Sequence, residues 1–100
     1  MDLDRIFDAL ASPLRRRTLA ALSQRALSTA ELAERFSASA PGMSRHLSVL
    51  ENAGLVASRR QGQRVLYSLV RDTLMEALSG FAGEFSPAET GTPKTTREAI

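Results

Sequence analysis

The stretch SASAPGMSRHLSVLENAGLV, residues 37–56, carries helix signals at both ends. Ser39 is a residue type that caps helix N-termini, and Pro41 fits the first turn, where a missing N–H breaks no hydrogen bond. Gly54 is the residue type that takes the left-handed conformation just after a helix. The sequence therefore predicts a helix over about residues 40–53.

The two sides of this helix differ in chemistry. At about 100° per residue, Met43, Leu47 and Leu50 fall on one side, which predicts the core face. The opposite side has little bulk, so its backbone can approach another surface closely, as a helix in the major groove of DNA does. A side that simply faces water has the same composition, so the helix alone leaves both interpretations open. The residues of this outward side are Pro41, Ser44, Arg45, Ser48 and Asn52.

Three further helices are expected before this one. Residues 2–10 have apolar side chains at the i, i+3, i+4, i+7 spacing of an amphipathic helix. Ser12 followed by Pro13 marks the N-cap and first position of a second helix. Ser28 and Glu31 have the spacing of a capping box and mark the start of a third, short helix.

After the fourth helix, two short runs rich in Val, Leu and Tyr flank Gly62, which can supply the positive φ of a tight hairpin. An apolar stripe over residues 71–85 predicts a fifth helix. We therefore expect a mainly α protein with a small β-hairpin (α+β), with the layout of a winged helix-turn-helix: five helices and a two-stranded wing. This domain would span residues 1–85 and serve DNA binding and dimerisation, and residues 86–100, with two Pro and few apolar residues, would form a disordered tail.

The composition excludes several classes of site. A chain of 100 residues with 43% hydrophobic residues suits one domain with one modest core. The absence of Cys and the single His exclude disulfides, thiolate metal sites and cysteine nucleophiles, so we expect no metal and no cofactor. No apolar run approaches the roughly 20 residues of a membrane span, and the start MDLDR is not that of a signal peptide, so we expect a cytoplasmic protein without a membrane partner.

Positive charge is concentrated in the middle of the chain. Residues 39–64 carry four Arg against Glu51 alone, a balance of +3, whereas the whole chain has a net charge of +2. Twelve of the thirteen basic residues are Arg, whose planar group suits phosphate or guanine. The hairpin tip RRQGQR, residues 59–64, would contact phosphates or enter a minor groove. The alternative is a solvated turn.

These segments together resemble one family. Their order and spacing are similar to those of the ArsR/SmtB family of bacterial winged-helix repressors. The four segments are LASPLRRRTLAAL, STAELAERF, MSRHLSVLENAGLV and RRQGQRVLYSL. The resemblance covers roughly residues 5–78. It implies a homodimer that binds double-stranded DNA at an inverted-repeat operator and represses its own or a neighbouring operon.

The resemblance also identifies candidate DNA-binding residues. It places Ala40, Pro41, Ser44 and Arg45 where family members contact bases, and Ser48 joins them on the outward side of the helix. It assigns the wing to Arg59, Arg60, Gln61, Gln63 and Arg64.

The chain departs from the metal-sensing members of this family. Where those carry Cys in the third helix, it has Ser28, Ala30 and Ala33, and near the fifth-helix site it has only Asp72 and Glu76. The chain looks most like the metal-independent branch, and the lack of Cys also excludes thiol-based redox sensing. The alternative is an effector-responsive regulator of the same family with a small-molecule site at the dimer interface; the effector is unknown.

His46 and Arg15 are expected to have structural roles. His46 flanks the core side of the fourth helix, so we expect it to pack against the third helix or to hydrogen-bond backbone or phosphate. The family resemblance suggests that Arg15 is structural. The neighbouring Arg16 and Arg17 would face solvent or flanking phosphates.

The first and fifth helices each have an apolar stripe that a small core cannot fully bury, which indicates an interface. Pairing them across a two-fold axis would place two recognition helices about one DNA turn apart, roughly 34 Å. The alternative is that both stripes pack on the core of the single chain. The predicted interface residues are Leu3, Ile6, Phe7, Leu10, Leu74, Leu78, Phe81 and Phe85.

Two other function classes are less well supported by the sequence. A winged-helix module that binds only a protein partner would have an apolar outward side on the fourth helix and an uncharged wing, the reverse of this chain. An enzyme would need a nucleophile or an acid–base pair on a common pocket wall, and we identify none. We therefore expect that the protein is not an enzyme.

Overall fold

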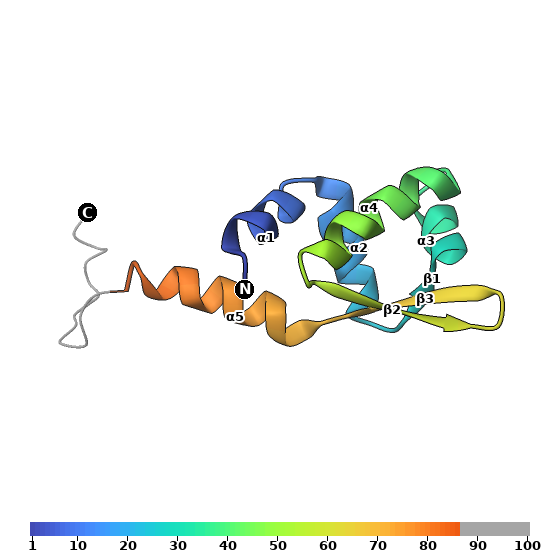
Figure 1. Cartoon of the computed structure of the whole chain (residues 1–100). Coiled ribbons are helices and arrows are strands. Elements are labelled where there is room, and N and C mark those ends of the chain that lie inside the picture. Colours follow the sequence, from blue (N-terminus) through green and yellow to red (C-terminus); the bar gives the residue numbers. More distant parts are fainter. Residues whose placement is uncertain (87–100) are drawn as a thin grey trace.

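The computed structural model describes residues 1–86. In Figure 1, helices α1 to α4 form one group, and the hairpin and α5 extend from opposite ends of it. The predicted five helices and hairpin wing are confirmed, whereas residues 87–100 of the predicted tail lie outside the described residues. The elements are α1 (Leu3–Leu10), α2 (Pro13–Leu22), β1 (Leu27–Ser28), α3 (Thr29–Arg35), α4 (Ala40–Asn52), β2 (Val56–Gln61), β3 (Arg64–Leu69) and α5 (Arg71–Gly83).

The wing belongs to a three-stranded antiparallel sheet with the order β1-β3-β2. Strands β2 and β3 form the predicted two-stranded wing, and the third strand was not predicted: β1 pairs with β3, with Ser28 opposite Leu66. Two residues are too few to show the alternation that predicts a strand, which is why β1 has no signal in the sequence. At the hairpin tip Gly62 has a φ of 65° and Gln63 has no positive φ, which matches a type II′ turn.

Helices α2, α3 and α4 begin at the predicted residues because serine side chains cap them. The hydroxyls of Ser12, Ser28 and Ser39 accept the backbone N–H of the residue three positions on, at 3.0 to 3.2 Å. Glu31 completes the capping box by accepting the Ser28 backbone N–H at 2.8 Å.

Helices α3 and α4 end in the same way, although only the second end is visible in the sequence. Gly54 follows α4 with a φ of 79°, as predicted, and Ser37 follows α3 with a φ of 55°, which was not predicted. The N–H groups of Ala38 and Leu55 then donate to carbonyls five residues earlier, at 2.9 and 3.0 Å. Both ends are Schellman motifs, which fix the direction in which the chain leaves each helix.

One core joins the helices to the sheet. The predicted core face of α4 is confirmed, because Met43, Leu47 and Leu50 are fully buried. Helix α4 packs against α1, α2, α3 and β2, so these three side chains lie at the centre of the core. The other large apolar side chains that are fully buried are Ile6, Leu27, Leu32 and Leu55.

The apolar stripes of α1 and α5 are buried to different degrees. Ile6 is fully buried within the single chain, so its assignment to a dimer interface is wrong. Phe7 of α1 packs edge-to-face on Phe81 of α5, with ring centroids 5.0 Å apart, yet Phe81 remains 39% exposed. Leu78 and Phe85 are also exposed, whereas the remaining predicted interface residues, Leu3, Leu10 and Leu74, are half-buried.

Candidate nucleic-acid interface

The outward side of α4 is a continuous surface of small and polar side chains around one cation. Ala40, Pro41, Ser44, Arg45 and Ser48 are all exposed, on the side of the helix opposite the buried Met and Leu residues. The ion pairs found within residues 1–86 do not include Arg45, so no carboxylate there neutralises its guanidinium group. Helix α4 therefore presents a positively charged group on a surface with little bulk.

The wing divides its arginines between the two faces of the sheet. Side chains alternate along a strand, so Ser58 and Arg60 of β2 share one face and Arg59 and Gln61 share the other. The Ser58 hydroxyl donates to Glu51 of α4 at 2.8 Å, which identifies its face as the one turned toward α4. Arg60 is therefore on the same face of the sheet as α4, and Arg59 is on the opposite one.

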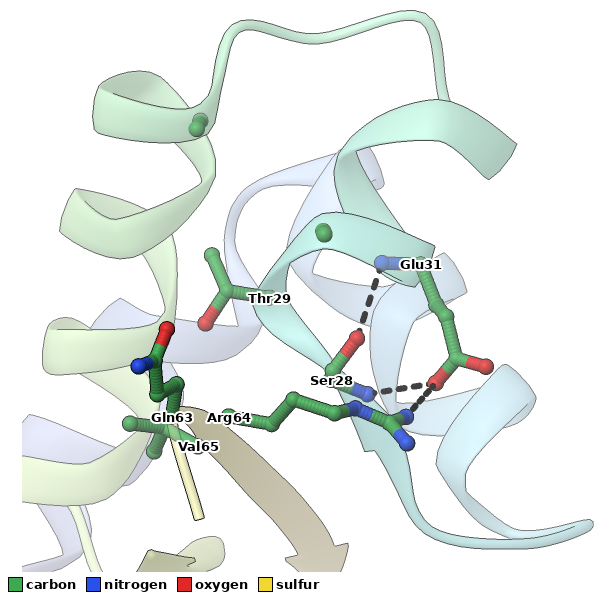
Figure 2. A pocket seen from close by; sticks show the side chains of 8 residues that line it. Ser28, Thr29, Glu31, Gln63, Arg64 and Val65 are labelled. Atoms are coloured by element: carbon green, nitrogen blue, oxygen red, sulfur yellow. Dashed lines mark hydrogen bonds and ion pairs between the residues drawn. The ribbon is translucent and has the colours of Figure 1, made fainter. Parts of the chain in front are cut away.

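Arg64, at the start of β3, is held by a carboxylate. Its guanidinium group donates to Glu31 of α3 at 3.2 Å, and the same carboxylate oxygen accepts the Ser28 backbone N–H (Figure 2). That backbone hydrogen bond, with the Ser28 hydroxyl and the positive charges of Arg64 and Arg25, holds the pKa of Glu31 below its ordinary value, against a smaller opposing effect of burial. Glu31 thus caps α3 and ties the wing to it.

A cleft separates the wing from the two helices of the helix-turn-helix. It has a volume of about 590 Å³ and brings Ala40 of α4 and Gln63 and Arg64 of the wing to one place. Figure 2 shows the Arg64 side chain reaching from the wing across to the start of α3. Arg45, Arg59 and Arg60 do not line this cleft. Its lining residues are Ser28, Thr29, Ala30, Glu31, Ala40, Gln63, Arg64 and Val65.

The ion pair of Glu31 with Arg64 was not predicted from the sequence. The spacing of Glu31 from Ser28 predicts a capping box and nothing more. Its partner Arg64 lies 33 positions away, and only the pairing of β1 with β3 brings the start of α3 beside the start of β3. Because no local pattern predicts a two-residue strand, the sequence contains no signal for this ion pair.

Arg15 has the structural role that the family resemblance suggested, because it joins α1 to α4 through its side chain. Its guanidinium group donates to the carbonyls of Ala9 and Asp8 at the end of α1, at 2.7 and 3.2 Å. It also lies 3.3 Å from Nδ1 of His46 on α4. Arginine has no acceptor, so this contact is a hydrogen bond when Nδ1 of His46 is unprotonated. His46 therefore contacts Arg15 of α2.

The comparisons with known proteins agree with this geometry. Residues 10–59 match the helix-turn-helix domain family. The transcriptional repressor SdpR of Bacillus subtilis is 31% identical over 77% of this chain and 86% of its own length. A crystal structure of an ArsR family transcriptional regulator, 30% identical, superposes with a TM-score of 0.75 over 82% of this chain and 84% of that one.

The protein belongs to the ArsR/SmtB family. This ArsR-family protein is therefore a DNA-binding transcriptional regulator with a winged helix-turn-helix fold. Its similarity extends to the homodimeric winged helix-turn-helix DNA-binding domain of Mycobacterium bovis, with 28% identity and a TM-score of 0.69 over 81% of this chain and 77% of that one. No helix within residues 1–86 is both long and apolar enough to span a membrane.

Proposed function

We propose that the protein is a dimeric repressor that reads an inverted-repeat operator, with α4 in the major groove and the wing on phosphates or in the minor groove. The observation that carries this proposal is the outward side of α4, where Arg45, which has no ion-pair partner within residues 1–86, lies among small residues, together with a wing that has three Arg. Such a side allows close approach to base edges, and an Arg fork can bind guanine with two hydrogen bonds.

The residues divide into two roles. Arg45 reads a base, while Ala40, Pro41, Ser44 and Ser48 let the backbone come close or add hydrogen bonds. The wing residues Arg59, Arg60, Gln61, Gln63 and Arg64 position the protein on the DNA through phosphate and groove contacts.

Dimerisation supplies the second half-site. Helix α5 and the turn after it expose an apolar surface that a second copy would cover, made of Met75, Leu78, Phe81 and Phe85. A two-fold axis through this surface would present the two α4 helices to successive major grooves, roughly 34 Å apart. The homodimeric relative from Mycobacterium bovis supports a dimer here, and the repressor from Bacillus subtilis supports repression as the regulatory effect.

The test is a titration of the full chain, followed by fluorescence anisotropy at two salt concentrations. The DNA is a fragment from upstream of the protein's own gene, with a shuffled fragment of equal length and composition as control. We expect a preference of at least ~10³ for the native fragment, the ratio typical of specific binding. Equal, strongly salt-dependent affinity for both fragments would reject autoregulation, and no binding to either would reject the DNA-binding assignment.

A further inference from the structure

A second cleft lies away from the wing tip, between α2, the end of β3 and α5. Its volume is about 400 Å³, within the range of small-molecule sites. Four different elements contribute to its apolar wall, so the cleft is a feature of the tertiary structure and not of one helix. The wall leucines are Leu10, Leu19, Leu69, Leu74 and Leu78.

Two arginines also line this cleft. Arg16 of α2 donates to the Leu10 carbonyl at 2.7 Å, and Arg71 of α5 donates to the Ser23 carbonyl at 3.4 Å. These hydrogen bonds occupy one of the five N–H donors of each guanidinium group. Neither arginine forms an ion pair with a carboxylate within residues 1–86, so both positive charges remain uncompensated there.

No carboxylate lines the cleft to balance them. At about 100° per residue, Asp72 and Glu76 fall on the side of α5 opposite Leu74 and Leu78, and both are exposed. The lining therefore combines a leucine wall with a charge of +2.

We propose that this cleft binds an aliphatic carboxylate. Its hydrocarbon chain would lie against the leucines, and its head group would accept hydrogen bonds from Arg16 and Arg71, since an Arg–carboxylate pair is strong and often bidentate. An apolar occupant, such as the α5 stripe of a second copy, would leave both guanidinium groups facing it without a counter-charge. Met75, Phe81 and Phe85 do not line the cleft, so a second copy can cover this part of the α5 surface and leave the cleft to the carboxylate.

The position of the cleft connects the ligand to DNA binding. Leu69 ends β3, the strand that begins with Arg64 in the wing, and Leu78 belongs to the exposed stripe of α5. A bound carboxylate would contact both elements. This regulatory consequence rests on the function proposed above. By linkage, the factor by which the ligand changes the affinity for DNA equals the factor by which DNA changes the affinity for the ligand.

The experiment is isothermal titration calorimetry of the full chain with octanoate, together with an NMR titration that locates the binding. The controls are 1-octanol, which has the same hydrocarbon chain without charge, and butanoate, which has the charge with a shorter chain. We expect octanoate to saturate one site per chain and to shift the backbone signals of Leu69 and Leu74. We expect 1-octanol and butanoate to bind at least about ten-fold more weakly, because 1-octanol lacks the charge and butanoate lacks most of the apolar surface.

Variants separate the cleft from a general charge effect. The double variant Arg16→Gln/Arg71→Gln should weaken octanoate binding at least about ten-fold. The matched control Arg17→Gln/Arg25→Gln removes the same charge from exposed positions outside the cleft and should leave the affinity unchanged. Ala20→Leu narrows the cleft without removing a charge and should also weaken binding, which keeps the test valid if the double variant unfolds.

Several outcomes would overturn the proposal. These are no saturable binding, equal binding of 1-octanol, equal reductions in affinity in both double variants, or binding that appears only in a monomeric variant, since a second copy would then close the cleft. The same samples are titrated with operator DNA. Specific DNA binding without octanoate binding rejects only the ligand site, whereas loss of sequence preference in the wild-type protein rejects the proposed function itself.

Discussion

Helices α4 and α5 both have thirteen residues, but they expose opposite kinds of surface. Helix α4 buries Met43, Leu47 and Leu50 and turns small, polar and basic side chains outward. Helix α5 buries only Ala77 and leaves its large apolar side chains exposed or half-buried. The comparison shows that α4 completes its packing within one chain, whereas α5 retains apolar surface for another molecule.

The arrangement in space explains this difference. Helix α4 lies within the group of helices over the sheet, while α5 leads away from that group (Figure 1). An exposed apolar stripe is stabilised when a partner removes it from water. The basic outward side of α4, which has little bulk, instead favours binding to a negatively charged partner with grooves, such as DNA. One chain therefore has two surfaces that suit different partners.

The largest expected effect is on α5. Phe81→Glu places a charge in the apolar stripe and should raise the dimer dissociation constant at least about thirty-fold, as the removal of one interface hot spot does. Sedimentation velocity measures this effect. Gly80→Glu is the matched control, because it adds the same charge at an exposed position with open space around it, on another side of α5. Equal dissociation in the two variants would show that the stripe is not the interface.

The next effect tests the outward side of α4. Arg45→Ala should cost about 1 to 3 kcal/mol of binding free energy on the operator and much less on shuffled DNA, because alanine cannot donate hydrogen bonds to a base. Anisotropy titrations measure both affinities, with Arg5→Ala, an exposed position on α1, as control. An equal reduction on both DNAs would show that Arg45 binds a phosphate.

The ends of the two helix-turn-helix helices offer a reciprocal pair of substitutions. Gly54→Ala should lower the free energy of unfolding by about 1 to 2 kcal/mol, because an L residue is strained at a φ of 79°. A Cβ there would meet only Thr73 of α5, at an ordinary 3.7 Å, so the cost is conformational. Ser37→Gly should have the opposite sign, since it relieves a φ of 55°. Urea denaturation of both variants measures the difference, and a stable Gly54→Ala protein would contradict it.

The wing arginines should differ in their contribution to salt dependence. Replacing Arg59 or Arg60 by Gln should reduce the slope of log affinity against log salt by about one unit for each phosphate that the wing no longer neutralises. Arg64→Gln should reduce the slope less, because Glu31 already compensates that charge. Anisotropy at a series of salt concentrations gives the slopes. A slope unchanged by all three replacements would remove the wing from the interface.

The smallest effect concerns Glu31 and pH. Because the folded state lowers the pKa of Glu31, its ionised form stabilises the protein above its ordinary pKa, and this contribution is lost as the pH falls through the lowered value. Glu31→Gln should therefore be less stable than the wild type near neutral pH, with the difference shrinking in acid. The variant should also bind shuffled DNA up to about five-fold more tightly, because Arg64 is released. A stability difference that is independent of pH would contradict this role.

The sequence by itself determined what short-range chemistry controls. The serine caps, Gly54, Gly62 and the helical spacing of Met43, Leu47 and Leu50 fix the ends of the helices, the hairpin turn and the core side of α4. These signals act within about one turn of a helix or within one β-turn, so neighbouring residues suffice to predict the features they control. The outward position of the predicted DNA-binding residues of α4 follows from the same spacing.

Only the tertiary structure decided which distant residues meet. Strand β1 exists because β3 pairs with it, and that pairing brings Arg64 to Glu31. The packing of the helices likewise brings Arg15 to His46 and buries Ile6, while Leu78, with the same kind of apolar side chain, remains exposed. The cleft between Arg16 and Arg71 is assembled from four elements. Each of these arrangements depends on the closure of long loops around a shared core, a property of the whole chain that no local pattern records.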